Sequence, residues 1–285
     1  MLFPMVVPVF ALQAFIVSLA TGTVGALLGL GGGVFMVPLL VFLLGVPLQV
    51  ASGASILVVL ATSIAAASKY VKDDMTNLRL GLFLEMATTL GALMGAFAVP
   101  FVSDQVLKIV FGVTLIYAAG VMFKQIRKGE RSWVNAPNDG LAERLSLGGS
   151  YYDEARGETI EYGVNRTPLT LVVSYVAGII SGLLGIGGGG VKVPAMNVVG
   201  NIPMKVAVAT SNFMIGITAA ASALVYIRNQ YTDAFIAAPV VLGTLIGASI
   251  GARYTNRVRG VALKKIFILM LFIVAVRMIF SGVGI

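Results

Sequence analysis

The segment LGLGGGVFMVP, residues 28–38, returns 156 residues later as LGIGGGGVKVP, residues 184–194. The same offset holds without a gap far from the glycines, and it relates Pro47 to Pro203. The chain therefore consists of two repeats, and each repeat is organised around one glycine cluster.

Composition excludes a soluble globular domain. Of the 285 residues, 58% are hydrophobic and 11% are charged, and the mean hydropathy is +0.96, whereas soluble domains carry about 25% charged residues. The chain has no Cys and no His. This removes thiol and imidazole chemistry and the commonest zinc ligands, so we expect no metal and no cofactor. The net charge of +8 needs no nucleic-acid partner, because membrane proteins keep Lys and Arg in cytoplasmic loops.

Ten apolar segments follow one another, and several approach or exceed the ~20 residues that a helix needs to cross a bilayer. They span residues 5–28, 34–46, 48–69, 79–101 and 105–124 in repeat one, and 168–184, 190–201, 204–227, 233–253 and 261–281 in repeat two. Five segments per repeat is an odd number, so the second repeat enters the membrane upside down. The predicted fold is an all-α polytopic membrane protein with two inverted five-helix repeats, residues 1–125 and 167–285. The first segment lacks a basic leading region and a clear cleavage site, so we interpret it as a retained helix.

The distribution of Lys and Arg predicts the topology. If all ten segments cross, sixteen of these residues lie on one side and three on the side of the termini, with Lys192 set apart as part of the motif. If the second and seventh segments do not cross, the division becomes twelve against seven. The positive-inside rule favours ten crossings of the cell (plasma or inner) membrane, with both termini outside the cytoplasm and residues 126–166 inside.

The polar linker, residues 126–166, carries six basic and seven acidic residues. Residues 151–155 and 159–163 could pair as a short β-hairpin. The favoured interpretation is a solvated tether between the repeats.

The second and seventh segments are short. The thirteen residues 34–46 give a helix of only ~20 Å at ~1.5 Å per residue, against a hydrocarbon core of ~30 Å. We expect each preceding glycine run to enter the membrane as an unwound connection, which is tolerated only inside protein or beside a wet cavity. In inverted repeats the two runs enter from opposite faces and should approach each other near the midplane.

The glycine runs are the first candidate substrate site. Gly-rich backbone that leads into a helix leaves N–H groups free at the positive end of the helix dipole, which suits an anion. The alternative is close helix packing, which we expect for Gly91-xxx-Gly95 and Gly247-xxx-Gly251. The candidate glycines are Gly31, Gly32, Gly33, Gly187, Gly188, Gly189 and Gly190.

Lys192 stands in the second motif where Met36 stands in the first. A lysine inside the membrane costs about 2.5–3.5 kcal/mol on insertion scales, and the positive end of a helix adds about 0.3–1 kcal/mol. A bound anion would relieve both costs. The alternatives are a structural ion pair with a carboxylate such as Glu85, or a side chain that extends to the outer surface.

Glu85 is the one acidic residue well inside an apolar segment, and its repeat counterpart is Val241. Buried carboxylates often relay protons, so Glu85 is a candidate for proton coupling. The other interpretations are a structural pair with Lys69 or Lys72, and a position that faces the cytoplasm.

Hydroxyl and amide side chains follow the short segments and could line a cavity around the glycines. Serine and threonine in membrane helices can instead bond carbonyls of their own helix. The candidates for substrate contact are Ser55, Asn197, Thr210, Ser211 and Asn212.

The paired motifs, together with Ala-Thr-Ser-Asn at residues 209–212, resemble the TauE/SafE sulfite exporter family over residues 10–125 and 168–282. The resemblance implies transport of sulfur-containing anions such as sulfite, sulfoacetate or thiosulfate by a secondary, proton-linked mechanism. The linker departs from the plainest members.

We therefore expect an alternating-access transporter whose partners are a small anionic substrate and the lipid bilayer. A homo-oligomer is compatible with the sequence. The alternatives on the same scaffold are a passive anion channel and a transporter of a small carboxylate. An enzyme is disfavoured, because the apolar segments offer no His, no Cys and no close carboxylate pair.

Overall fold

The computed structural model describes residues 3–28, 33–128, 137–153, 157–254 and 260–284. Each of the ten predicted apolar segments is helical there, with ends within a few residues of those expected. The first half contains α1 (Phe3–Leu28), α2 (Gly33–Leu44), α3 (Leu48–Lys72), α4 (Leu78–Ala98) with the 3₁₀ turn η1 (Val99–Phe101), and α5 (Asp104–Lys128). The second half contains α7 (Thr167–Leu184), α8 (Gly189–Pro194) continuing into the π-helical turn η2 (Ala195–Val199), α9 (Met204–Arg228), α10 (Ala234–Tyr254) and α11 (Gly260–Val283).

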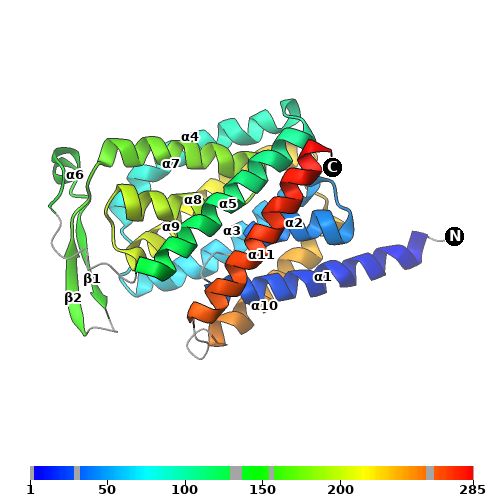
Figure 1. The fold of residues 1–285 in the computed structure, drawn as a ribbon, viewed down its shortest axis with the longest axis horizontal. Coiled ribbons are helices and arrows are strands. Elements are labelled where there is room, and N and C mark those ends of the chain that lie inside the picture. Colours follow the sequence, from blue (N-terminus) through cyan, green and yellow to red (C-terminus); the bar gives the residue numbers. More distant parts are fainter. Residues whose placement is uncertain (1–2, 29–32, 129–136, 154–156, 255–259, 285) are drawn as a thin grey trace.

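The molecule is a helical, multi-pass membrane protein. Among the described residues, α3, α4 with η1, α5, α7 and α9 contain stretches long and apolar enough to cross a bilayer, and α1, α2, α10 and α11 contain shorter apolar runs. Figure 1 shows α1 beginning and α11 ending at one end of the molecule, while the linker elements lie at the opposite end.

The two halves interlock by exchanging helix partners. The first helix of each half packs on the fourth helix of the other half, as α1 on α10 and α7 on α4, while α3 packs on α9 and α5 on α11. Small residues allow the close approach: a Cβ on Gly91 or Gly95 would overlap a carbonyl oxygen of α7, and one on Gly247 would overlap a carbonyl oxygen of α1. The predicted packing role of these three glycines is confirmed. The surroundings of Gly251 lie outside the described side chains.

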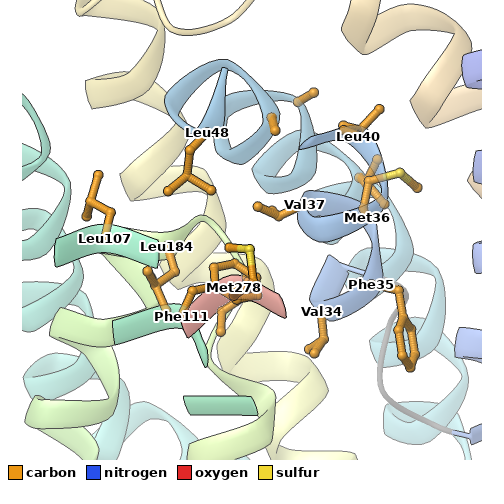
Figure 2. Close-up of a cluster of buried hydrophobic side chains, with 14 of the residues drawn as sticks. Val34, Phe35, Met36, Val37, Leu40, Leu48, Leu107, Phe111, Leu184 and Met278 are labelled. Atoms are coloured by element: carbon orange, nitrogen blue, oxygen red, sulfur yellow. The ribbon is translucent and has the colours of Figure 1, made fainter. Parts of the chain in front are cut away.

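An apolar cluster surrounds the short helix α2 (Figure 2). The side chains labelled in the figure are branched, aromatic or sulfur-containing and carry no polar atom that forms strong hydrogen bonds, so close packing holds them together. The members labelled in the figure are Val34, Phe35, Met36, Val37, Leu40, Leu48, Leu107, Phe111, Leu184 and Met278, all buried.

The described part of the linker, residues 137–153 and 157–166, is a folded cap and not a solvated tether. It contains α6 (Gly140–Arg144) and an antiparallel hairpin of β1 (Gly149–Asp153) and β2 (Glu158–Tyr162), with Tyr151 opposite Ile160. The predicted hairpin is thus confirmed, one to two residues earlier than expected. Successive strand side chains point to opposite faces, so β2 can bury Ile160 and Tyr162 while its charged residues stay exposed. The tether interpretation was wrong because it considered only the polar average composition of the segment. Alternating side chains along the strands give one face that is apolar enough to pack.

The cap packs on the ends of α4 and α9. Its buried side chains form one apolar cluster with Leu80 and Leu84 of α4 and Val206 of α9. Asn77, the N-cap of α4, donates from Nδ2 to the carbonyl oxygen of Leu147 at 2.7 Å and to the hydroxyl of Tyr162 at 3.0 Å. The cap therefore covers the end of the helices that carry the polar site described next.

Candidate functional site

The second glycine run is unwound, as predicted. Gly185 ends α7 with φ 67°, and Gly187 and Gly188 follow with φ 73° and 72° before α8 begins. These positive values favour glycine. A Cβ on Gly185 would also overlap the carbonyl oxygen of Ser52 on α3. Residues 29–32, which include the predicted candidates Gly31 and Gly32, lie outside the described residues.

The described parts of the two runs lie next to each other. A Cβ on Gly33 would lie 3.6 Å from the carbonyl oxygen of Ile186, which belongs to the second run. Ser55 on α3 donates a hydrogen bond of 3.1 Å to the carbonyl oxygen of Gly33. The same α3 helix meets the second run through Val59, which lies against Gly187. The expected approach of the two runs is therefore present, with α3 contacting both.

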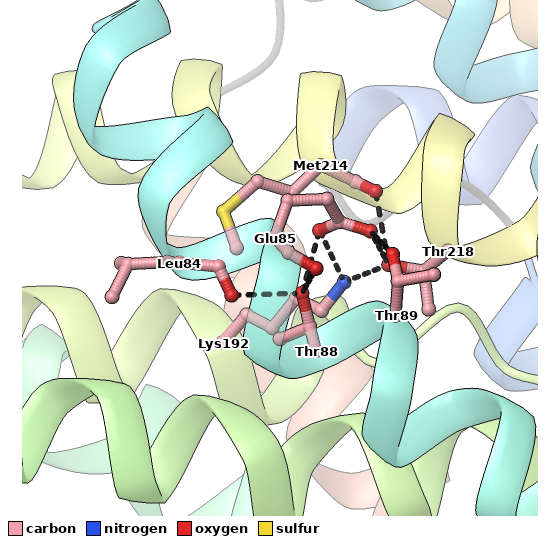
Figure 3. Close-up of polar contacts among 7 residues, drawn as sticks. All are labelled: Leu84, Glu85, Thr88, Thr89, Lys192, Met214 and Thr218. Atoms are coloured by element: carbon pink, nitrogen blue, oxygen red, sulfur yellow. Dashed lines mark hydrogen bonds and ion pairs between the residues drawn. The ribbon is translucent and has the colours of Figure 1, made fainter.

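Lys192 and Glu85 form a buried ion pair between the two halves of the chain (Figure 3). The Lys192 Nζ lies 3.5 Å from Oε2 of Glu85, and the two side chains are 0% and 4% exposed. Lys192 comes from α8 and Glu85 from α4. Glu85 is thus not paired with Lys69 or Lys72, both of which are exposed. That prediction was wrong about the partner, because the exchange of helices brings α8 next to α4.

Three threonine hydroxyls complete this cluster. Thr88 and Thr89, one turn along α4, donate to the two carboxylate oxygens of Glu85 at 2.7 Å each. Thr218 of α9 accepts from Lys192 Nζ at 2.5 Å and donates to Oε1 of Glu85 at 2.5 Å. A buried ion pair persists only when such additional hydrogen bonds satisfy it. The hydroxyls of α4 and α9 therefore supply the additional hydrogen bonds that this buried ion pair needs.

The helix that carries Lys192 is irregular immediately beyond it. Pro194 has no N–H to donate and is followed by the π turn η2, in which the N–H of Gly200 reaches the carbonyl oxygen of Ala195. Single π turns occur frequently at functional sites, because they break the regular ladder of the helix. Lys192 thus stands between an unwound glycine run and a π turn.

Three predicted contact residues have structural partners instead. Asn197 donates to the carbonyl oxygen of Ile202 at 2.9 Å, and Asn212 donates to that of Val208 at 2.9 Å. The hydroxyl of Thr210 accepts from the backbone N–H of Asn77 at 3.0 Å. The hydrogen bonds of these three polar groups go to the backbone and not to the Lys192–Glu85 pair.

Ser211 differs from its neighbours on α9. It is fully buried and its hydroxyl has no hydrogen-bond partner among the described residues. It lies 3.9 Å from the Cβ position of Gly189, at the start of α8. Ser181 of α7 is also buried without a partner, 3.2 Å from the Cβ position of Gly188. A Cβ on Gly190 would meet only Ala118, at 3.6 Å, so the loop is more open there.

Sequence reasoning missed Thr88, Thr89 and Ser181. The two threonines follow Glu85 by three and four residues, the spacing at which helical side chains share a face. That spacing is a signal that could have identified them. Ser181 has no such signal, because its repeat counterpart is Gly25 and small residues in membrane helices usually serve packing.

Comparison with known proteins agrees with this architecture. The family model described as "Sulfite exporter TauE/SafE" matches residues 14–278, which include both glycine motifs, Glu85 and Lys192. The "Probable membrane transporter protein YunE" of Bacillus subtilis (strain 168) is 28% identical over 275 residues, covering 94% of this chain and 97% of the relative. YdhB of the same organism, also named a probable membrane transporter protein, is 24% identical over 255 residues, covering 89% and 92%.

A probable membrane transporter protein of Xylella fastidiosa (strain 9a5c) is 25% identical over 278 residues, covering 95% of this chain and 97% of the relative. No solved structure matches the chain. The family match spans nearly the whole sequence, so this chain belongs to the TauE/SafE sulfite exporter family.

Proposed function

We propose that this chain is a secondary membrane transporter of a small sulfur-containing anion such as sulfite, sulfoacetate, thiosulfate or a related organosulfonate. Transport proceeds by alternating access, and the anion binds near the bilayer midplane between the two glycine runs. The family to which the chain belongs and the names of its relatives support the transport class. The site chemistry supports the charge of the substrate.

The single observation that carries the proposal is the burial of Lys192. Its side chain is 0% exposed in the middle of the molecule, where an unneeded charge would be expensive. It follows a glycine run whose backbone can approach a ligand closely, with the unpartnered hydroxyls of Ser181 and Ser211 against that run. An anion that contacts Lys192 would find a cation, hydroxyl donors and flexible backbone together.

Alternating access follows from an inverted arrangement of the two halves. The exchanged helix pairs, and the position of the chain ends opposite the linker, support such an arrangement (Figure 1). Ten crossings would put both termini outside and the linker in the cytoplasm. Because the chain has no Cys, single cysteines test this directly. Ser150→Cys should react only with a membrane-permeant reagent in intact cells, and Gln230→Cys should also react with an impermeant one.

Transport is also proton-linked in this proposal, with Glu85 as the group that takes up the proton. It is a carboxylate buried in α4, 4% exposed, and in contact with the proposed substrate-binding lysine. Intramembrane carboxylates of this kind mark proton pathways in transporters. A passive channel on this scaffold would need no such group, and saturable, pH-driven uptake in proteoliposomes would distinguish the transporter from it.

The test is a thermal-shift screen of purified wild-type protein and Lys192→Met against sulfite, sulfate, thiosulfate, taurine, sulfoacetate and small carboxylates. A ligand at 100 times its Kd adds about 2.7 kcal/mol of apparent stability. Lys192→Met introduces the residue that the first motif carries at Met36, so it suits the site sterically. Loss of a hydrogen bond to a charged group, about 1.5–3 kcal/mol, should weaken binding by about one to two decades. Equal affinity in the two proteins would overturn the assignment of Lys192, and a shift with carboxylates alone would overturn the substrate class.

A further inference from the structure

We infer that Glu85 acts as an internal anion that occupies Lys192 when no substrate is bound, so that the substrate anion and one proton enter the site together. The inference rests on the proposed function, because it requires that an anion bind Lys192. It adds the physical cause of the coupling, which is competition between Glu85 and the substrate for Lys192, and a stoichiometry of one proton per anion.

The groups around Glu85 are hydrogen-bond donors and one cation, a set that an ionised carboxylate can accept. Its side-chain partners are the ammonium of Lys192, 3.5 Å away, and the hydroxyls of Thr88, Thr89 and Thr218. An ionised carboxylate only accepts hydrogen bonds, and each of these four groups can donate one. The substrate-free site is therefore neutral overall, with one positive and one negative charge.

A substrate anion cannot simply be added to this pair. Lys192 is fully buried and its Nζ is already engaged by Thr218 and Glu85. An anion that contacts Nζ would meet the Glu85 carboxylate within a few ångströms, because Nζ and Oε2 are 3.5 Å apart. Two anions that share one buried cation cannot both remain ionised, as in paired active-site carboxylates. Either the Glu85 carboxylate moves away from Lys192, or it takes up a proton.

The threonines allow Glu85 to take up a proton without leaving a polar atom unsatisfied. The Thr88 hydroxyl lies 3.2 Å from the carbonyl oxygens of both Leu84 and Glu85, and the Thr218 hydroxyl lies 3.0 Å from that of Met214. Either hydroxyl can therefore rotate, donate to its own helix and accept from a protonated Glu85. The hydroxyls can serve both protonation states, so the site does not need to rebuild its helices to change state.

Lys192 is the charged partner that this step involves. On α7, α8 and α9 the titratable side chains are Tyr175, Lys192, Lys205, Tyr226 and Arg228. The cap adds Tyr151 and Tyr162, which pack with Leu80 and Leu84 of α4. Tyr175 donates to Sδ of Met94, and Tyr226 donates to the carbonyl oxygens of Gly182 and Leu183. Lys205 and Arg228 lie in the first and last turns of α9, away from Thr218 in its middle. The Lys192–Glu85 pair is thus the pair whose charge state depends on substrate.

The step is balanced in charge. A free anion and a free proton enter, the anion takes the place of the carboxylate at Lys192, and the proton binds a carboxylate oxygen of Glu85. The site carries no net charge before or after when the anion is monovalent, so the anion and the proton cross the bilayer together without net charge. A divalent anion would carry one negative charge.

The experiment is isothermal calorimetry of sulfite binding to wild type, Glu85→Gln and Lys192→Met, each in buffers of different ionisation enthalpy, which counts protons taken up. Sulfite itself titrates near neutral pH, and Glu85→Gln serves as the matched control for that contribution. We expect wild type to take up about one proton more per sulfite than Glu85→Gln. The variant should bind sulfite at least as tightly as wild type, because the internal competitor is gone, and with less pH dependence.

Two failures are distinguishable. Equal proton uptake by wild type and Glu85→Gln, with binding still lost in Lys192→Met, overturns the internal-anion inference and leaves the proposed function standing. Equal sulfite affinity in wild type and Lys192→Met overturns the proposed site, and the inference with it. Infrared difference spectra of wild type keep the test available if Glu85→Gln does not fold. Sulfite should produce a carbonyl band of a protonated carboxyl group that shifts in Glu85→Asp, and absence of the band contradicts the inference.

Discussion

Met36 and Lys192 occupy equivalent positions in the two motifs and are both 0% exposed, yet their surroundings differ in kind. Met36 lies in the apolar cluster of α2 (Figure 2), whereas Lys192 lies in the polar cluster of α4 and α9 (Figure 3). The counterpart of Glu85 is Val241, which packs against the apolar cluster. The duplicated scaffold thus contains an apolar corner, which is the cluster around Met36, and a polar corner, which is the cluster of Lys192, Glu85 and the three threonines.

The threonines of the two corners show the same difference. Thr62 is the counterpart of Thr218, and its hydroxyl lies 2.9 Å from the carbonyl oxygen of Val58 on its own helix. Thr244 is the counterpart of Thr88, and it donates to Val240 on its own helix at 2.8 Å. Thr88 and Thr218 also reach carbonyl oxygens of their own helices, but in addition they contact the Glu85 carboxylate. Residue identity therefore does not decide the role; the neighbouring charge does.

The largest loss of stability should come from replacing only one member of the Lys192–Glu85 ion pair by an apolar residue. Glu85→Leu leaves Lys192 as an unpaired buried charge, which should destabilise the protein by about 3–5 kcal/mol. The double variant Glu85→Leu/Lys192→Met, apolar like the other corner, should recover wild-type stability or exceed it by about 1–4 kcal/mol. Unfolding of the purified proteins in detergent measures both. If the single variant were as stable as wild type, the ion pair would not hold the corner together.

A smaller difference should separate the two equivalent threonines. Thr218→Val removes a hydroxyl that bonds both members of the ion pair, and a hydrogen bond to a charged group is worth about 1.5–3 kcal/mol. Thr62→Val removes a hydroxyl that bonds backbone carbonyls, for which about 0.5–1.5 kcal/mol is expected. Unfolding of both isosteric variants in detergent, measured in parallel, compares the two losses of stability. Equal losses would mean that the charged cluster adds nothing at Thr218.

Two equivalent glycines sharpen the comparison further. A Cβ on Gly178 would overlap the carbonyl oxygen of Thr88, and one on Gly22 would overlap that of Thr244. Overpacking should cost each alanine variant about 1–3 kcal/mol. Because Thr88 bonds Glu85, only Gly178→Ala should also change the pH dependence of sulfite binding, measured by thermal shift. Gly120→Ala, where a Cβ would meet nothing within 4 Å, is the neutral control. A pH effect in Gly22→Ala would argue against a local cause.

Much of the fold could be predicted because hydrophobic length and repetition are properties of the sequence itself. The helices follow the apolar segments, and Pro47 and Pro203 immediately precede α3 and α9, where a residue without an N–H fits the start of a helix. The two charged residues of the site were also evident, since a charge in an apolar run is conspicuous. Their pairing was one of the interpretations of Lys192, and the structure confirms it. The sequence could not select it over a pair of Glu85 with Lys69 or Lys72, because the choice depends on which helices exchange between the halves. Lys69 and Lys72 are nearer to Glu85 in sequence but exposed in the fold.

The polar candidates were harder to assign than the charged ones. An amide or hydroxyl in an apolar helix needs a partner, but the sequence does not show whether a ligand or a backbone carbonyl provides it. Asn197 and Asn212 donate hydrogen bonds to backbone carbonyl oxygens, whereas the Ser211 hydroxyl has no partner among the described residues. The cap was missed for a related reason: its residues average to a polar composition, and its apolar face exists only once the strands alternate.

The smallest effect concerns the cap, which packs on the polar corner through Leu84 and Val193, the chain neighbours of Glu85 and Lys192. Asp139 holds the cap together, since its carboxylate accepts hydrogen bonds from the N–H groups of Leu141 and Thr167. Burial raises the pKa of Asp139, but the hydrogen bonds that its carboxylate accepts outweigh burial and hold the pKa below its ordinary value of 3.8.

A carboxyl whose pKa is lower in the folded than in the unfolded state stabilises the fold above its unfolded pKa, and loses that contribution as the pH falls through the folded value. The stabilisation of the cap by Asp139 should therefore be complete at neutral pH and should decrease only below about pH 4. Asp139→Ala should cost about 0.5–2 kcal/mol, the usual loss for an N-cap. Asp139→Asn keeps a capping oxygen and should remove the acid sensitivity of the cap.

Hydrogen exchange resolved along the chain is the measurement, because it separates the two corners. Asp139→Ala should raise exchange in the hairpin and in the first turns of α4 and α7, while α2 and α10 in the apolar corner remain as in wild type. Uniform acceleration across both corners would mean that the cap stabilises the whole bundle. Unchanged exchange at Leu141 and Thr167 would mean that the Asp139 hydrogen bonds contribute nothing. A response confined to these elements would show that the cap stabilises the polar corner alone. There it is positioned to exclude water from the buried ion pair.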